Sequence, residues 1–394
     1  MTSPGEVYIV SAARTPIGNF LGTLSSLSAA ELGAVAVKEV IARANVPAAD
    51  VDEVILGQSL TAGQGQNPAR QASLAAGVPK EVPAFLINML CGSGLKTVQL
   101  GYQAIRSGDA SIVVTGGQES MSKAPHALHL RGGTKMGEAK MTDTMLSDGL
   151  VDFFNDIHMG VTAENVAKEC GITREQQDAF AVESQKRTAE AQQKGYFKDE
   201  IVAVQVPGRK ETITFEKDEF PKPGTTLEGL AKLKSCFIKE GTVTPGNASG
   251  VNDSAAAVLL MSAEEVKKRA AKPLAKVVAF AQAGICPKTM GTAPISAVQK
   301  VLVKAGWKLE DVDLFELNEA FAAQAIAVNN ALKVDLKKVN VNGGAIALGH
   351  PIGASGCRVL VTLLYALKRT GGKKGVASLC IGGGMGVAMA VEMV

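Results

Sequence analysis

Ser111-Ile-Val-Val-Thr-Gly-Gly117 is a short apolar run that stops at two glycines, and Val376-Ala-Ser-Leu-Cys-Ile-Gly-Gly383 repeats this pattern later in the chain. Runs of this kind, rich in β-branched residues and bounded by glycine, predict strands that end at the glycines. An amphipathic helical pattern precedes each strand, over residues 93–106 and 355–368. The same helix–strand unit therefore occurs twice.

A further match extends the repeat. Asp50-Val-Asp-Glu-Val-Ile-Leu-Gly57 is similar to Asp311-Val-Asp-Leu-Phe-Glu-Leu-Asn318, and all three matches keep the same order at a roughly constant offset. Chance likeness between βαβ units is the alternative, but three ordered matches favour an internal duplication. Apolar strands that alternate with amphipathic helices predict an α/β fold. Its two mostly parallel sheets are expected to pack face to face across a central layer of helices.

One segment has no counterpart in the second half. Residues 121–251 break the repeat with paired glycines, prolines and a polar stretch, so we expect an inserted loop domain that carries ligand contacts. The apolar run over 255–261 is expected to return the chain to the first half. We therefore predict an N-terminal half of residues 1–120 plus 252–271 and a C-terminal half of residues 272–394.

Composition and charge exclude several classes of protein. Hydrophobic residues make up 46% of the 394 residues and charged residues 20%, which argues against extensive disorder. A net charge of +3 without a long basic run gives no sign of nucleic-acid binding. No stretch reaches the ~20 apolar residues of a membrane span. No targeting leader precedes the first expected strand, Val7 to Val10, so we expect a cytoplasmic location.

The six cysteines are widely spaced, without a Cys-x-x-Cys pair, so neither a disulfide framework nor a metal site is expected. Cys91 differs from the others because it lies between a predicted strand, which begins at Ala84, and a helix that opens at Ser93-Gly94. The helix dipole and free backbone N–H groups there stabilise a thiolate and are expected to lower its pKa. Cys91 is thus a candidate nucleophile, with a buried structural cysteine as the alternative.

Three further reactive groups stand beside turns. His350, inside the glycine-rich run 342–356, could deprotonate a thiol or donate a hydrogen bond to an oxyanion. Cys380, at the tip of its predicted strand, could exchange a proton with a carbon acid. Asn318, after the strand over 312–317, could orient a water or a substrate oxygen. Taken singly, His350 could be a turn histidine and Cys380 an interior cysteine, and the motif around Asn318 is weak.

Together these segments resemble the motifs of the thiolase family, and the likeness covers essentially the whole chain. It implies an α/β thiolase fold of five layers, αβαβα, built from the two duplicated halves with an inserted loop domain. The matching motifs are Cys91-Gly-Ser-Gly, Asn318-Glu-Ala-Phe-Ala, Gly349-His-Pro-Ile-Gly, Cys380-Ile-Gly-Gly-Gly, Ser11-Ala-Ala-Arg-Thr-Pro-Ile-Gly and Gly65-Gln-Asn-Pro-Ala-Arg-Gln.

The resemblance also assigns catalytic roles. Cys91 would take up an acyl group as a thioester, and His350 would assist the ionisation of its thiol. His350 and a water held by Asn318 would bind the thioester oxygen of a second substrate, from which Cys380 would remove the α-proton. The backbone N–H groups of Cys91 and Gly382 would form a second oxyanion hole.

The resemblance places coenzyme A on the loop domain and its flanks. Lys222 and Thr225 would serve the nucleotide end, and Met290 and Phe321 would close the acyl pocket and so restrict chain length. The remaining implied contacts are Leu150, His158, Met159, Phe237, Ala248, Ser249 and Ala320.

Within the family, Cys-Gly-Ser-Gly and the His158-Met159 pair are typical of the biosynthetic, short-chain branch. This implies condensation of two acetyl-CoA to acetoacetyl-CoA and CoA, and the reverse thiolysis, with no cofactor or metal besides coenzyme A as substrate and product. It also implies a homotetramer, a dimer of dimers joined through residues 131–141. Ser254, where relatives usually have glycine, is expected to tighten a turn. A degradative 3-ketoacyl-CoA thiolase and a non-catalytic acyl-CoA-binding scaffold remain the alternatives.

Overall fold

The computed structural model describes residues 5–208 and 210–394. Within them ten strands form one continuous sheet. The first half contributes β4 (Ala84–Ile87), β3 (Glu53–Gly57), β5 (Ile112–Ser120), β12 (Asn252–Ser262) and β1 (Val7–Arg14), in that order, with β2 (Gly18–Asn19) paired to β12. The second half continues with β13 (Ala275–Gly284), β16 (Met385–Met393), β15 (Lys374–Ile381) and β14 (Leu314–Leu317).

The two halves repeat one strand order. The run β3-β5-β12-β1 matches β14-β15-β16-β13, and the runs join where Tyr8 pairs with Lys276 and Ile9 with Ala275. The prediction of mostly parallel sheets is wrong, because every pairing of β1, β12, β13 and β16 is antiparallel. Strand β16 follows β15 after only Gly382–Gly384, and so short a connection can join only antiparallel strands.

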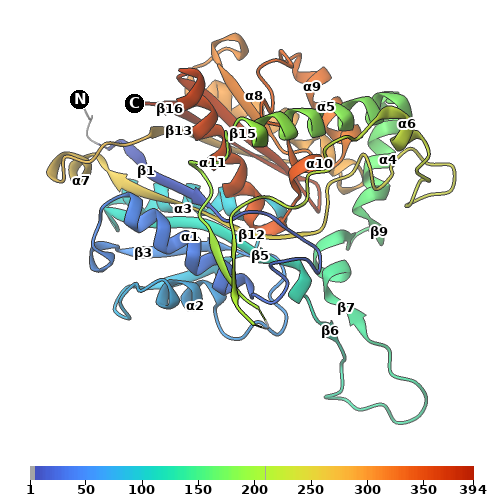
Figure 1. The fold of residues 1–394 in the computed structure, drawn as a ribbon, viewed down its shortest axis with the longest axis horizontal. Helices are drawn as coiled ribbons and strands as arrows, with labels where there is room; N and C mark the ends of the chain where they lie inside the picture. Colours follow the sequence, from blue (N-terminus) through green and yellow to red (C-terminus); the bar gives the residue numbers. More distant parts are fainter. Residues whose placement is uncertain (1–4, 209) are drawn as a thin grey trace.

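The five-layer arrangement is confirmed by the way side chains divide among three cores (Figure 1). Along β12, Ala257 and Leu259 face an outer core while Val258 and Leu260 face the central one, as the two-residue period of a strand requires. One outer layer consists of α1 (Ala29–Arg43) and α2 (Pro68–Ala75), and the central layer consists of α3 (Ser93–Ser107) and α11 (Ile352–Thr370). The other outer layer consists of α8 (Ala293–Ala305) and α9 (Ala322–Leu332).

Glycines at the layer contacts explain a second difference from the prediction. Strand β5 does not stop at Gly116 and Gly117 but runs on to Ser120. A Cβ on Gly116 would lie 2.2 Å from the carbonyl oxygen of Ala256, and one on Gly117 would lie 2.1 Å from that of Gly353. These glycines therefore allow close packing against β12 and α11 rather than ending the strand.

The segment between β5 and β12, which was predicted to be an inserted loop domain and is called the loop domain below, separates two neighbouring strands of the sheet. Strand β12 pairs with β5 and β1 of the first half. A long excursion between β6 and β7 projects from the body of the molecule (Figure 1). No helix in the described part of the chain is long and apolar enough to cross a bilayer. The loop-domain elements are β6 (His126–Ala127), β7 (Thr142–Asp143), β8 (Val151–Asp152), β9 (Ile157–His158), α4 (Met159–Cys170), α5 (Arg174–Gln193), β10 (Val204–Pro207), β11 (Thr212–Phe215) and α6 (Leu227–Ala231). Two short helices lie outside it, α7 (Ala263–Lys268) and α10 (Ala345–Leu348).

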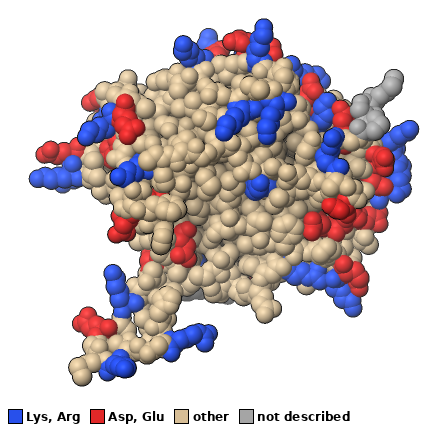
Figure 2. All heavy atoms as spheres, turned by 180° about the vertical axis from the view of Figure 1, so that it is seen from behind, with Lys and Arg blue, Asp and Glu red and all other residues tan. Residues whose placement is uncertain are grey.

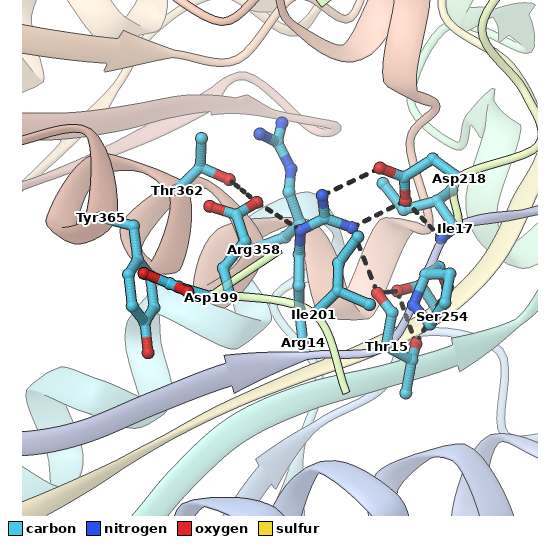
Figure 3. Close-up of polar contacts among 12 residues, drawn as sticks. Arg14, Thr15, Ile17, Asp199, Ile201, Asp218, Ser254, Arg358, Thr362 and Tyr365 are labelled. Carbon is cyan, nitrogen blue, oxygen red and sulfur yellow. Dashed lines mark hydrogen bonds and ion pairs between the residues drawn. The ribbon is translucent and has the colours of Figure 1, made fainter. Parts of the chain in front are cut away.

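A buried ion-pair network ties the loop domain to β1 (Figure 3). The Nε of Arg14 donates to Glu200 at 2.6 Å, and its Nη1 and Nη2 donate to the two carboxylate oxygens of Asp218 at 2.7 and 2.9 Å. All three side chains are fully buried. Ser254 lies beside this network within β12, where its hydroxyl is 3.0 Å from that of Thr15. The expectation that Ser254 tightens a turn is therefore wrong.

Replacing Arg14 with leucine should lower the free energy of unfolding by about 3–5 kcal/mol, because Glu200 and Asp218 would then be buried without their counter-charge. Arg269 is a matched control, since it pairs with Glu265 and Asp50 at the surface. Its replacement with leucine should cost about 0–1 kcal/mol. Denaturant unfolding followed by circular dichroism measures both changes, and equal losses would contradict this role of Arg14.

Candidate active site

Cys91 lies at a tight turn between β4 and α3. The chain passes through a 3₁₀ turn at Leu90–Gly92, and Leu90 itself has a positive φ of 48°. Two side chains hold this turn: Asn88 Oδ1 accepts from the N–H of Leu90 at 2.9 Å, and Ser93 Oγ donates to the carbonyl of Leu90 at 2.7 Å. The local sequence thus presents the thiol at the start of the central helix.

A largely apolar cavity of about 310 Å³ brings the two thiols and the imidazole together from separate parts of the chain. Cys91 comes from the first half, and His350 and Cys380 come from the second. The predicted contact residues that line it are Leu150, His158, Met159, Phe237, Ala248, Ser249, Met290, Ala320 and Phe321. Ile352 of the Gly349-His-Pro-Ile-Gly motif also lines it, as do Met121, Met145 and Leu146, which no sequence motif indicated.

The prediction of a lowered pKa for Cys91 is wrong. Burial raises the pKa of the Cys91 thiol to about 12, although the backbone N–H groups of Gly382 and of Cys91 itself act in the opposite direction. Burial also raises the pKa of Cys380, and the nearby Cys91 raises it further. Desolvation therefore outweighs the helix dipole. Both groups are thiols at neutral pH, so a base must accompany the ionisation of either one.

His350 is suited to be that base. Its Nδ1 is 2.6 Å from Ser355 Oγ, and the Ser355 hydroxyl donates its proton to the carbonyl of Pro351 at 2.8 Å. Nδ1 must therefore carry the hydrogen, which leaves a lone pair on Nε2. Nε2 is buried and has no hydrogen-bond partner among the described residues. Burial, together with the charge of Arg358, lowers the pKa of His350 to about 4 and keeps the ring neutral.

The backbone at His350 is also fixed from the first half. The N–H of His350 donates to Asn252 Oδ1 at 2.9 Å, and Asn252 Nδ2 donates to the carbonyl of Gly18 at 2.9 Å. Gly349 has a φ of 104° and no room for a side chain, because a Cβ would lie 2.4 Å from Asn252 Oδ1. Sequence reasoning missed Asn252 and Ser355, since neither stands in a recognisable motif.

Asn318 follows β14 at the same end of the sheet as Cys380. Its backbone N–H donates to the carbonyl of Ser378 at 2.9 Å. Both polar atoms of its side chain are buried without a partner among the described residues. A buried amide of this kind fits an ordered water, as the predicted role requires.

Aromatic side chains of the loop domain form one wall of the cavity. His158 accepts from the N–H of Gly160 at 3.0 Å, and its ring stacks on Phe237 with centroids 4.7 Å apart. Phe237 meets Phe321 edge to face at 6.2 Å. Burial lowers the pKa of His158, which favours the neutral ring. The face of this neutral ring gives the cavity an apolar surface, and its nitrogens give a polar edge.

Lys222 and Thr225 lie outside this cavity, in a second hollow of about 260 Å³ that Leu233 and Pro245 also line. The two spaces are neighbours. Gly250 borders the first, Phe220 lines the second, and a Cβ on Gly250 would lie 2.3 Å from the Phe220 ring. In the described part of the chain, no three His, Cys, Asp or Glu side chains are grouped so that they could hold a metal ion.

Comparison with known proteins identifies the family. The model of the thiolase N-terminal domain matches residues 7–264, and that of the thiolase C-terminal domain matches residues 271–393. The acetyl-CoA acetyltransferase of Shinella zoogloeoides is 59% identical over 392 residues, which cover 100% of both chains. The cytosolic acetyl-CoA acetyltransferase of Mus musculus is 57% identical over 388 residues, with 98% of both chains covered. The crystal structure of the Bacillus anthracis acetyl-CoA acetyltransferase matches with a TM-score of 0.97 at 44% identity and covers 100% of both chains. The chain belongs to the thiolase family.

Proposed function

We propose that this protein is an acetyl-CoA C-acetyltransferase, which condenses two acetyl-CoA to acetoacetyl-CoA and CoA and catalyses the reverse thiolysis. One observation carries the proposal: two thiols and a neutral imidazole with a free Nε2 converge in a single apolar cavity. The relatives named acetyl-CoA acetyltransferase support the same reaction over the full length of the chain.

In the first half-reaction, His350 Nε2 takes the proton of Cys91 as the sulfur attacks the thioester carbonyl of acetyl-CoA. A bond forms between Cys91 Sγ and the acetyl carbon, the bond from that carbon to the CoA sulfur breaks, and the imidazolium returns the proton to the departing CoA thiolate. The N–H groups of Cys91 and Gly382 point at the thiol and can stabilise the charge on the acetyl oxygen.

In the second half-reaction, the acetyl-enzyme accepts a carbon nucleophile. His350 Nε2 takes the proton of Cys380, and the resulting thiolate removes the α-proton of a second acetyl-CoA, whose oxygen is held by the Nε2–H of the imidazolium and by a water on Asn318. The enolate carbon attacks the acetyl carbonyl, the carbon–carbon bond forms, and the bond to Cys91 breaks. The imidazolium of His350 then returns its proton to the Cys91 thiolate, and Cys380 keeps the α-proton as a neutral thiol. The balance is two acetyl-CoA to acetoacetyl-CoA and CoA.

The cavity walls support a short acyl chain. Met290 and Phe321 are both buried and close the apolar space beside Cys380. Ala248, Ser249, Ala320 and Phe237 line the remaining path for the pantetheine arm, and Lys222 and Thr225 in the neighbouring hollow would receive the nucleotide end. No cofactor is needed beyond coenzyme A as substrate and product.

We also propose a cytoplasmic homotetramer, a dimer of dimers. The cytosolic mouse relative supports the location. The excursion between β6 and β7 carries Leu130, Met136 and Met141 as exposed apolar side chains, which suits a contact with another subunit. The face seen in Figure 2 carries few charged side chains across its middle, and such depletion is typical of buried interfaces.

Mass spectrometry after brief exposure to acetyl-CoA tests the covalent step. The wild type and Cys380→Ser should each gain one acetyl group on Cys91, whereas Cys91→Ala should gain none. Cys380→Ser should nevertheless fail to form acetoacetyl-CoA, because a serine hydroxyl is far less acidic than a cysteine thiol and does not ionise to remove the α-proton. An unacetylated, folded wild type would favour the non-catalytic scaffold, and normal condensation by Cys380→Ser would remove Cys380 from the mechanism.

The pH dependence of acetylation tests His350. Its pKa of about 4 and the Cys91 pKa of about 12 mean that a neutral base faces a thiol. Wild-type acetylation should therefore vary little from about pH 6 to about pH 8. In His350→Ala the rate should fall about 10²–10⁴-fold. The acetylation rate of His350→Ala should rise about tenfold per pH unit, because without His350 the rate follows the fraction of Cys91 thiolate, which grows tenfold per unit below the pKa of Cys91.

Single-turnover quench experiments measure these rates. Ser355→Ala is the matched control, since it keeps the imidazole but releases the Nδ1 hydrogen bond, and it should lose less activity than His350→Ala. Parallel pH profiles for wild type and His350→Ala would show that His350 is not the base.

A chain-length series tests the acyl pocket. The wild type should cleave four-carbon 3-ketoacyl-CoA far better than eight-carbon substrate, and Met290→Ala should raise kcat/KM for the longer chain about 10-fold or more. Thiolysis assays with synthetic substrates provide the comparison. An equal kcat/KM for short and long chains in the wild type would instead identify a degradative 3-ketoacyl-CoA thiolase.

A further inference from the structure

Glu119 is fully buried at the end of β5, and burial raises the pKa of its carboxyl to about 7, although backbone N–H groups act in the opposite direction. Its Oε2 accepts from the N–H of Ser59 and from the N–H of Gly353, both at 2.9 Å, and its Oε1 accepts from the N–H of Leu60 at 3.2 Å. One side chain of the first half thus holds a loop of its own half and the first turn of α11 in the second half. No step proposed above uses it.

On one side, this contact reaches His350. Gly353 is the second residue of α11, whose N-terminus has no side-chain cap of its own from Pro351. A carboxylate at this position satisfies a free N–H and lies at the positive end of the helix dipole. Gly353 admits the carboxylate because it lacks a side chain, since a Cβ would lie 2.8 Å from Glu119 Oε2. The segment from His350 to Gly353 is therefore fixed to β5.

On the other side, the contact reaches Cys91. The carbonyl of Ser59 accepts from Asn88 Nδ2 at 3.3 Å, and Asn88 Oδ1 accepts from the N–H of Leu90. Leu90 has a positive φ and immediately precedes Cys91, so its conformation depends on that hydrogen bond.

Apolar contacts follow the same path. Leu60, Met121 and Ile352 pack together under the cavity, and Cys91 packs against them. Ile352 belongs to the same first turn of α11 as Gly353, and Leu60 gives one of the three N–H groups to Glu119.

We propose that Glu119 is a positioning residue, which sets the separation of Cys91 Sγ and His350 Nε2 by bridging the two loops that carry them. The proposal rests on the proposed function, since it concerns the proton transfer between these two groups. Glu119 does not touch the reacting atoms. It acts through the backbone of Gly353 and through the path from Ser59 to Leu90.

The test is Glu119→Gln, which keeps the size of the side chain but replaces one acceptor oxygen with a donor. Its kcat should fall about 100-fold, because misplacement of a catalytic group by about 1 Å has an effect of this order. The KM for acetyl-CoA should change little. Glu119→Asp keeps the charge but loses reach, so it should not rescue kcat.

Alkylation of Cys91 by iodoacetamide separates positioning from general damage. At alkaline pH hydroxide can ionise Cys91, so the reaction then needs the thiolate but not His350. The charge of Glu119 raises the pKa of Cys91. Alkylation of Glu119→Gln should therefore be as fast as that of the wild type or faster. Glu200→Gln is the control for loss of a buried carboxylate elsewhere, and it should keep its kcat. An unchanged kcat in Glu119→Gln, or parallel losses of turnover and alkylation, would overturn the proposal.

Crystal structures keep this result distinct from the proposed function. If the wild type forms no acetyl-Cys91, the proposed function fails, but the separation of Cys91 Sγ and His350 Nε2 can still be compared between wild type and Glu119→Gln. A larger separation in the variant supports the bridge, and an unchanged separation overturns it.

Discussion

The close packing of α3 against α11 is the constraint on which the rest of the structure depends. A Cβ on Gly94 would lie 2.6 Å from the backbone nitrogen of Cys357, and one on Gly356 would lie 2.3 Å from that of Leu95. The two glycines occupy equivalent places in the repeat, so each helix gives the other the space to approach. Because Cys91 precedes α3 and His350 precedes α11, this contact brings the two groups to one cavity.

Burial at this contact determines the chemistry more than the helix dipoles do. The closed packing removes water from Cys91, Cys380 and His350, which raises the pKa of both thiols and lowers that of the imidazole. Each group is thereby held in its neutral form, and charge appears only when a proton moves between them. A site of this kind favours a sequence of proton transfers timed by substrate over a standing thiolate, which water and oxidants would attack.

The sequence predicts those parts of the molecule that depend on short local patterns of apolar residues and glycines. The duplication, the central helices and the cavity residues of the glycine motifs follow from local runs around Cys91, His350 and Cys380. The prediction was wrong where the same residue type can serve two structural purposes. Gly116 and Gly117 were predicted to end a strand, but they lie within β5 and allow close packing. Ser254 was predicted to lie in a turn, but it lies inside β12. The contacts of Asn252, Ser355 and Glu119 could not be predicted from the sequence. Asn252 and Glu119 bond to segments far away in the chain, and the bond of Ser355 to His350 depends on how one side chain is oriented.

The duplication gives the two halves the same arrangement of strands and central helix, and the differences between the halves determine which reactive groups meet in the cavity. The two halves share strand order and a glycine-bearing central helix. Strand β5, however, carries Glu119 near its end and leads into the loop domain, whereas β15 carries Cys380 near its end and turns at once through Gly382–Gly384 into β16. The first half therefore provides the buried carboxyl of Glu119 and the cavity wall of His158 and Phe237, and the second provides Cys380 and the wall of Met290 and Phe321. Two identical halves would offer the same groups twice, and only their divergence brings two thiols and an imidazole to one cavity.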